Sequence, residues 1–385
     1  MPPSGRSVIT IGSFDGVHLG HRALVEAARC LAVLHQDRTG QPTRVVALVF
    51  DPHPASVLRP GSEPARLTTY ARRDALLSNV GAHEIVRLQP TPALLEMSPA
   101  DFITSLVIRH NPVAFVEGAD FRFGHKRAGD IALLRTRGRE RPEAEQFAIH
   151  VVDAVEVALG DQSIVTASST IARRLIEGGR VADAARVLGA PYAIQGVVVR
   201  GDRRGRTLGY PTANVAAESM LPADGVYAGC ATAFDAAGRA IGPFIAAVSV
   251  GTKPQFTASG TPAARTLEAF LLDVPRTPGS PAIAGLPEYG WRISLDLIAY
   301  LRDQSRFDGV PALVDQIERD CARAREAVAR FGTLPEPAIG AAGFAVVSTA
   351  PSAIAGEPTS SHACASQQAR HPNERTNGKE AATCP

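Results

Sequence analysis

The sequence predicts two folded domains of different class, an α/β domain with a doubly wound parallel sheet followed by an all-β barrel. Over residues 8–179, continuous apolar runs alternate with stretches of helical spacing, which is typical of a parallel sheet covered by helices. From about Tyr192, five apolar runs follow one another with no helical stretch between them, which indicates a barrel or meander. Beyond Phe331 the chain is rich in Ala, Pro, Ser, Thr and Gly without periodicity, which predicts a disordered tail.

Composition and charge favour a soluble cytosolic protein over a nucleic-acid-binding, membrane or secreted protein. A length of 385 residues is enough for two hydrophobic cores, and a net charge of +2 gives no reason to expect nucleic acid or an anionic membrane as a partner. The five cysteines are scattered outside any metal-ligand spacing, which favours free thiols in a reducing compartment. No apolar run reaches the ~18 residues of a membrane span, and no secretion signal is visible at the N-terminus. We therefore expect a cytoplasmic protein, with weak self-association left open.

The first domain is expected to span residues 1–188 and to alternate strands with helices. Ser98-Pro99-Ala100-Asp101 resembles a capping box with proline in the first turn, which predicts the start of a helix. Helical spacing also occurs at 24–34, 76–80 and 170–177. Continuous apolar strands are expected at 8–11, 44–50, 84–88, 114–117 and 147–157. Such sheets bind ligands beyond the carboxyl ends of their strands, so the loops that follow these runs are the candidate site.

The second domain is expected to span residues 189–332, with a tail over 333–385. Its strands are predicted at 193–200, 226–234, 244–250, 266–273 and 291–300. A helix after Asp308 carries an apolar stripe that would close the barrel. Residues 276–287, rich in Pro, Gly and Ala, are expected to form a surface loop.

A glycine-rich turn between the first strand and the first helix is the strongest candidate site. The turn begins at Gly12, contains Gly16, and ends in a helix that opens with His18 and His21. This geometry directs backbone N–H groups and the positive end of a helix dipole at one point, which suits an anion. Two imidazoles there can donate hydrogen bonds to phosphoryl oxygens and neutralise charge that develops on them.

The string Gly12-Ser-Phe14-Asp15-Gly16-Val-His18-Leu-Gly-His21 resembles the H-x-G-H nucleotidyltransferases. The full string resembles one branch of them, the bacterial bifunctional riboflavin kinase/FMN adenylyltransferases, also called FAD synthetases. The resemblance implies a Rossmann-like domain in which the phosphate of FMN attacks the α-phosphorus of ATP and pyrophosphate leaves. It assigns charge stabilisation to His18, His21, Arg173 and Mg²⁺, and nucleotide binding to Gly12, Phe14, Asp15 and Gly16.

Three more segments of the first domain extend this resemblance. Ser168-Ser169-Thr170 with Arg173 stands at a helix start and resembles the family signature Ser-Ser-Thr-x-Ile-Arg, although Ile171 and Ala172 depart from its order. Asp120-Phe121-Arg122 resembles a loop beside the flavin and the nucleotide, and His53 lies in a segment that resembles the flavin-side loop. Taken alone, Ser-Ser-Thr is most often a helix cap, and aromatic residues around an arginine can equally form a core stack.

The second domain carries its own phosphate-binding string, Gly205-Arg206-Thr-Leu-Gly209-Tyr-Pro211-Thr212-Ala-Asn214. Glycines let a loop backbone approach phosphates, and the oxygens of Thr212 and Asn214 are suitable ligands for Mg²⁺. The string resembles the riboflavin kinase signature, which implies a Greek-key barrel that phosphorylates riboflavin with ATP. The resemblance also implies Glu268 as the base that accepts the proton of the riboflavin hydroxyl, and Arg302 as a binding residue. Without the resemblance, a lone glutamate in an alternating strand would simply face solvent.

Several positions depart from the family pattern and keep alternatives open. Ser249, Gln255 and Phe270 replace the residues usual near the flavin and nucleotide flaps, and residues 276–287 look like an insertion. One alternative is a monofunctional FMN adenylyltransferase whose barrel only binds flavin. Another is a different H-x-G-H nucleotidyltransferase, which would leave the second string unexplained. The favoured interpretation is a bifunctional enzyme with riboflavin, FMN and ATP as substrates.

Overall fold

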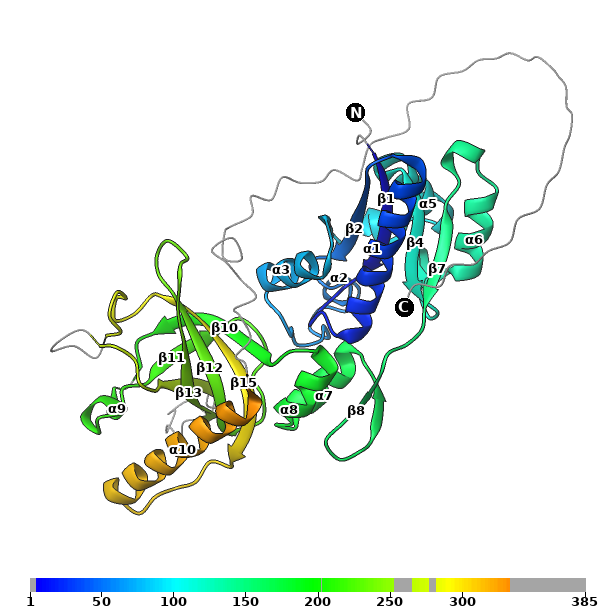
Figure 1. Cartoon of the computed structure of the whole chain (residues 1–385). Helices are drawn as coiled ribbons and strands as arrows, with labels where there is room; N and C mark the ends of the chain where they lie inside the picture. Colours follow the sequence, from blue (N-terminus) through cyan, green and yellow to red (C-terminus); the bar gives the residue numbers. More distant parts are fainter. Residues whose placement is uncertain (1–4, 202, 253–264, 277–281, 333–385) are drawn as a thin grey trace, which may run out of the picture.

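The computed structural model describes residues 5–201, 203–252, 265–276 and 282–332. Figure 1 shows an N-terminal α/β unit and a C-terminal barrel, with two helices between them. The predicted tail lies outside the described residues.

The N-terminal unit contains a five-stranded parallel sheet, as predicted. Its order is β3 (Glu84–Leu88), β2 (Thr43–Phe50), β1 (Arg6–Gly12), β4 (Pro112–Gly118) and β7 (Ala148–Val152). The central strands are rich in Val, Ile, Leu and Ala that are buried on both faces, so helices must cover both. On one face pack α1 (Leu19–Thr39) and α3 (Tyr70–Val80), and on the other packs α5 (Pro99–His110).

The helix ends follow the predicted signals. The Ser98 side chain caps α5 by accepting a hydrogen bond from the Asp101 N–H at 3.1 Å, and Gly81 ends α3 with a positive φ. The remaining short elements connect the sheet strands: α2 (Ala55–Leu58), α4 (Pro92–Leu95), β5 (Arg122–Phe123), η1 (His125–Arg127), β6 (Gly129–Asp130), α6 (Ile131–Arg139) and η2 (Glu143–Glu145).

The prediction of one strand over 147–157 is wrong. The chain leaves the parallel sheet after β7, and β8 (Glu156–Ala158) pairs antiparallel with β9 (Ile164–Thr166) in a separate hairpin. Apolar residues continue through both segments, so the break at 153–155 is not visible in the hydrophobic pattern.

The C-terminal unit is a closed antiparallel barrel, as predicted. Its order is β10 (Tyr192–Val199), β11 (Ala213–Ala217), β14 (Arg265–Leu271), β13 (Ala240–Thr252), β12 (Gly225–Phe234) and β15 (Arg292–Arg302). Strands β12, β13 and β14 form a meander, and its last strand, β14, pairs with the earlier strand β11. These four strands therefore form a Greek key. The helix α10 (Val310–Phe331) packs outside, where Val328 contacts Cys230 and Ile298.

Three features of the barrel differ from prediction. Strand β11 was expected to be loop, and the short helix α9 (Arg204–Thr207) interrupts a region in which no helix was expected. The sequence of β11, Ala-Asn-Val-Ala-Ala, has low strand propensity, and it is extended because it closes the ladder between β10 and β14. The expected surface loop is also partly packed: Arg276 forms a β-bridge with Ile283, and Ile283 and Leu286 are buried.

The helices α7 (Ser169–Glu177) and α8 (Val181–Leu188) join the two units (Figure 1). Their apolar residues Leu175, Ile176 and Val187 belong to the same hydrophobic cluster as the interior of the barrel. None of the helices in the described ranges combines the length and apolar character that a membrane crossing requires.

Candidate active sites

The turn after β1 is held in a strained conformation. Phe14 and Val17 have φ angles of 51° and 41°, in the left-handed region that non-glycine residues rarely adopt, and both side chains are fully buried. Gly16 has a φ of 83°, and a Cβ there would lie 2.8 Å from Leu67. Such strain persists where packing fixes the backbone, and it is common at functional sites. The predicted glycine-rich turn is therefore a rigid structure.

His18 and His21 lie together at the start of α1, as predicted. Their rings stack with centroids 3.6 Å apart, and the ring of Phe14 lies 5.0 Å from that of His21. His18 Nδ1 accepts a hydrogen bond from the His21 backbone N–H at 3.4 Å, which caps the helix. Since Nδ1 is then unprotonated, the neutral ring of His18 carries its proton on Nε2 and can donate it to a ligand.

Both histidines are neutral at pH 7. Burial, with a smaller contribution from the positive charge of Arg173, lowers the pKa of His18 to about 4. Burial, the neighbouring His18 and Arg173 lower the pKa of His21 well below its usual value. The rings therefore offer hydrogen-bond donors to an anion, and they gain positive charge only if an anion raises their pKa values.

Arg173 and Ser169 reach the turn from α7, more than 150 residues along the chain. Arg173 donates to the Asp15 carboxylate at 2.5 Å, and Ser169 Oγ donates to the Asp15 carbonyl at 2.7 Å. Ser168 caps α7 through the Ile171 N–H, and Thr170 is exposed in the first turn. The helix-cap interpretation of Ser-Ser-Thr is thus correct for Ser168. The two predicted signatures meet around Asp15.

A pocket of about 380 Å³ opens beside this turn. Its apolar lining includes Phe50, Pro52 and Met220, and its polar lining includes Arg173 and the predicted His53. Partial burial lowers the pKa of His53, and its Nδ1 accepts from the Ala55 N–H at 3.1 Å.

Arg73, which the sequence analysis did not select, connects the loops around this pocket. Its Nη1 donates to the carbonyls of Ser13 and Phe50, both at 3.3 Å, and its guanidinium lies 3.6 Å from the Asp51 carboxylate. Position 73 falls on the apolar stripe of α3 together with Leu76, Leu77 and Val80. A charged residue on a buried helix face is a signal that could have identified it.

Glu117 is a second unpredicted polar residue, buried at the end of β4. Its Oε1 accepts a hydrogen bond from the Ile11 N–H at 2.8 Å, directly before the turn. Burial raises the pKa of Glu117 well above its usual value. This carboxyl therefore fixes the spacing of β1 and β4 at the edge where the site lies.

The segment Asp120–Arg122 follows β4 at the same edge but is not among the residues that line the pocket. The Phe121 ring stacks on Phe123 with centroids 5.5 Å apart, and Asp120 and Arg122 are exposed. Phe121 thus fits the core-stack alternative, and the assignment of this segment to the ligand stays a prediction.

The predicted residues of the barrel site lie on adjacent strands. Asn214 of β11 is paired with Glu268 of β14, and Thr212 Oγ1 lies 3.2 Å from a Glu268 carboxylate oxygen. Along β14, Leu267, Ala269 and Leu271 fill the interior, so Glu268 and Phe270 project from the outer face. Glu268 is therefore not a solitary solvent-facing residue.

A smaller pocket of about 70 Å³ adjoins these residues. It is lined by the predicted Gly205, Arg206, Pro211, Thr212 and Asn214. The predicted Gly209 is not among the lining residues and lies in the turn with a φ of 84°. A Cβ on Gly205 would overlap the Tyr210 carbonyl.

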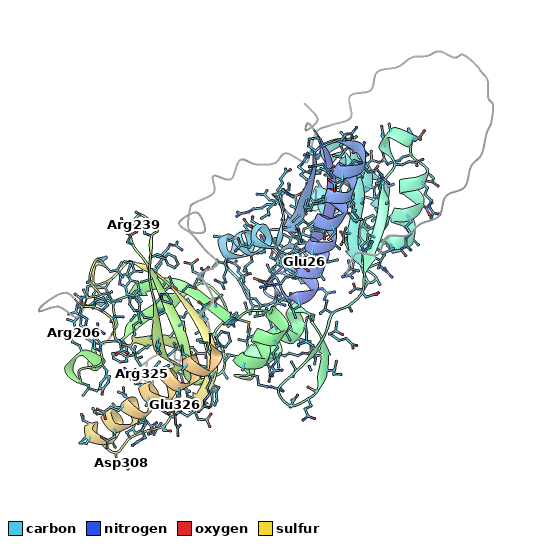
Figure 2. All side chains as sticks on the ribbon, in the orientation of Figure 1. Glu26, Arg206, Arg239, Asp308, Arg325 and Glu326 are labelled. Atoms are coloured by element: carbon cyan, nitrogen blue, oxygen red, sulfur yellow. The ribbon has the colours of Figure 1, made fainter. Side chains whose placement is uncertain are left out.

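Charged side chains also line this pocket. Arg206 pairs with Glu288, and Arg203 donates to the Tyr289 hydroxyl at 3.1 Å. Figure 2 shows Arg206 on the side of the barrel that faces away from the N-terminal sheet. The two pockets thus lie in different parts of the molecule. Gly201, four residues before Gly205, has no side chain, which leaves room for Asn214.

The unusual residues of the barrel have local partners. Phe270 packs edge-on against Tyr210, with centroids 5.2 Å apart, and Ser249 accepts a hydrogen bond from Gln304 at 3.2 Å. Arg302 binds Asp320 of α10 through three contacts of 2.6–3.1 Å and is not among the residues that line the smaller pocket. Gln255 lies outside the described residues.

The donors around Glu268 fit a magnesium ion. Thr212 and Asn214 offer neutral oxygens, which are hard ligands of the kind that Mg²⁺ selects, and the Glu268 carboxylate lies beside them. Within the described ranges no group of three or more His, Cys, Asp or Glu is arranged to hold a metal. A nucleotide-bound Mg²⁺ takes one or two protein ligands and completes its shell with phosphates and water.

Comparisons with known proteins match each half of the chain to a family model and most of the chain to bifunctional relatives. The family described as FAD synthetase matches residues 2–167, and the family described as riboflavin kinase matches residues 188–328. The chain is 32% identical over 338 residues to the bifunctional riboflavin kinase/FMN adenylyltransferase of Escherichia coli K12, covering 87% of this chain and 96% of that protein. It belongs to the bifunctional riboflavin kinase/FMN adenylyltransferase family.

Two further comparisons cover most of the chain. The enzyme of that name from Bacillus subtilis is 29% identical over 333 residues, covering 86% of this chain and 94% of that protein. A crystal structure titled "Macrolide-efflux Protein" from Streptococcus pneumoniae has a TM-score of 0.66 and 26% identity, covering 84% of this chain and 98% of that one. We call residues 1–188, the expected extent of the first domain, the transferase domain, and residues 189–332, the expected extent of the second, the kinase domain.

Proposed function

We propose that the chain converts riboflavin to FAD in two ATP-dependent steps, one in each domain, in the cytoplasm. The observation that carries the proposal is the contact of Thr212 with Glu268 opposite Asn214, because the kinase domain holds the departures from the family pattern. Among these departures, Ser249 is paired with Glu268 across β13 and β14, and Phe270 lies two residues further along β14, so both lie beside the contact and leave its residues intact.

In the kinase step, Glu268 accepts the proton of the riboflavin primary hydroxyl as that oxygen attacks the γ-phosphorus of ATP. The bond to the β,γ-bridging oxygen breaks, and ADP leaves with FMN as the product. Gly205 and Gly209 let the loop backbone approach the phosphates, and Arg206 pairs with phosphate after leaving Glu288. Mg²⁺ held by Thr212, Asn214 and the nucleotide would neutralise phosphate charge.

In the transferase step, a phosphate oxygen of FMN attacks the α-phosphorus of ATP and the bond to the α,β-bridging oxygen breaks, which releases pyrophosphate. His18 and His21 donate hydrogen bonds to the phosphoryl oxygens, and Arg173 adds positive charge from α7. No side chain forms a covalent bond in this step. The pocket beside the turn takes the flavin of FMN.

The test is a pair of incubations of the purified full-length chain with ATP and Mg²⁺, one with riboflavin and one with FMN. We expect FMN and FAD from the first incubation and FAD with pyrophosphate from the second. FAD from FMN without any product from riboflavin would contradict the kinase step. Nucleotidyl transfer to an acceptor other than FMN would contradict the flavin assignment.

A further inference from the structure

The transferase pocket has one wall that comes from the kinase domain. Glu218, Ser219 and Met220, which follow β11 of the barrel, line the pocket together with His53 and Arg173 of the transferase domain. Met220 is 9% exposed, so its side chain lies within the wall.

The backbone of Met220 is held from both sides. Its N–H donates to the Arg66 carbonyl of the transferase domain at 2.8 Å, and its carbonyl accepts from the Tyr192 hydroxyl at 2.8 Å. Glu218 is tied to the barrel by its N–H, which donates to the Gln195 carbonyl at 2.9 Å, and by an ion pair with Arg292 at 3.3 Å. The wall is therefore fixed in place and does not depend on ligand to form.

Further polar contacts behind this wall hold the two domains together. Thr69, which caps α3, donates to Gln195 Oε1 of the barrel at 2.5 Å. Next to it, the buried Arg72 lies 3.6 Å from the buried Asp296 carboxylate. A buried ion pair is costly to separate, because each partner would be left as an uncompensated charge. The kinase domain is thus anchored where it completes the pocket.

The lining suits the planar ring of the acceptor. The Arg66 guanidinium lies 4.1 Å above the Tyr70 ring and both residues line the pocket, while Phe50, Pro52 and Met220 supply apolar surface. The polarisable thioether of methionine packs well against aromatic rings. The charged end of the pocket, at Asp15 and Arg173, adjoins the histidines, where the phosphate would lie.

We propose that the segment Glu218–Met220 of the kinase domain is the acceptor-side wall of the transferase site, and that Met220 contacts the flavin ring of FMN. This inference rests on the proposed function, in which FMN is the acceptor of the adenylyl group. It makes the second reaction depend on a residue of the domain that carries out the first.

The test compares Met220→Ala with Met97→Ala in the full-length chain, with FMN supplied for the transferase step and riboflavin for the kinase step. Met97 is a half-buried methionine of the transferase domain that is not among the residues lining the pocket. We expect Met220→Ala to raise KM for FMN by about tenfold, because apolar contact is lost. The KM for ATP and both kinase constants should stay within about twofold. Met97→Ala should leave all of these constants within about twofold of their wild-type values.

Met220→Gln provides the second variant, because it keeps the length of the side chain and removes the apolar contact. It should also raise KM for FMN, and it decides the result if Met220→Ala weakens the kinase step. An unchanged KM for FMN in Met220→Gln, or equal rises in KM for FMN and for ATP, would overturn the inference. If instead wild-type protein makes no FAD from FMN, the proposed function itself has failed.

Discussion

The two candidate sites solve the problem of binding phosphate in opposite ways. The transferase site is buried and rigid: its histidines are neutral, and its turn contains residues with positive φ. The kinase site lies on the outer face of a barrel, and its Arg206 is half-exposed in an ion pair with Glu288. The geometry of the first site is therefore set by the folded backbone before any ligand binds. In the second site, Arg206 must leave the Glu288 carboxylate before it can bind a phosphate.

The largest expected effect is that of Glu268→Gln on the kinase step. Removing a general base typically costs 10²–10⁴-fold in rate, so we expect FMN formation from riboflavin to fall by about 10³-fold. FAD formation from supplied FMN should stay within about twofold, because Glu268 belongs to the other site. Glu326→Gln, on the exposed face of α10 (Figure 2), is the matched control. Loss of both activities in a folded variant would argue against two separate sites.

The reverse comparison is His21→Ala. We expect FAD formation from FMN to fall by roughly 10²–10³-fold, as for the loss of a donor to a developing oxyanion, while FMN formation is retained. Product formation in the two separate assays measures both effects. His150→Ala, an exposed histidine on β7, should leave both steps unaffected. Retention of FAD synthesis in His21→Ala would show that Arg173 and the backbone suffice.

The buried histidines should also make the transferase domain sensitive to acid. The pKa of His18 is about 4 in the folded chain and 6.5 in the unfolded chain, so the unfolded chain binds more protons between these values. The stabilisation from the neutral ring is therefore complete above pH 6.5 and is lost as the pH falls toward 4. From pH 7 to pH 5, we expect His18 to account for a loss of roughly 2 kcal/mol in the free energy of unfolding.

Denaturation of wild type and His18→Asn at the two pH values would measure this loss. Asparagine is a good N-cap, so the variant retains the start of α1 but has no group that titrates in this range. The loss on acidification should be smaller in His18→Asn by the stated amount, and His150→Asn should behave like wild type. Equal losses in wild type and His18→Asn would contradict the prediction.

The smallest expected effect concerns the half-exposed kinase pair. Glu288→Gln removes the carboxylate that competes with ATP for Arg206, so KM for ATP in the kinase step should fall by about two- to threefold. The transferase step should be unchanged. Steady-state kinetics with riboflavin in excess would measure the effect. A rise in KM for ATP would instead indicate that Glu288 positions Arg206.

Much of the fold and of the two candidate sites could be predicted from sequence, because each signature string is continuous in the chain. The H-x-G-H turn and the string from Gly205 to Asn214 are local, and strand periodicity placed most of the sheet and barrel. Glu117 and Met220 were missed because each acts on a segment distant in sequence, and no local pattern records that contact. Arg73 was missed although its charge on the apolar stripe of α3 was a local signal. Strand β11 was missed since its residues favour the extended conformation only when β10 and β14 lie on either side.

Strand β11 also sets a limit on how the chain can change in length. At its start lie Thr212 and Asn214, which we propose hold Mg²⁺ in the kinase step, and directly after its end comes the wall of the transferase pocket. Asn214 and Glu218 are separated by ~13 Å at 3.3 Å per residue. Removing or adding one residue within 213–217 would reverse which side chains face the barrel interior and shift one of the two ends. Insertions and deletions in β11 should therefore reduce activity far more than substitutions do, because this short strand fixes the distance between the two candidate sites.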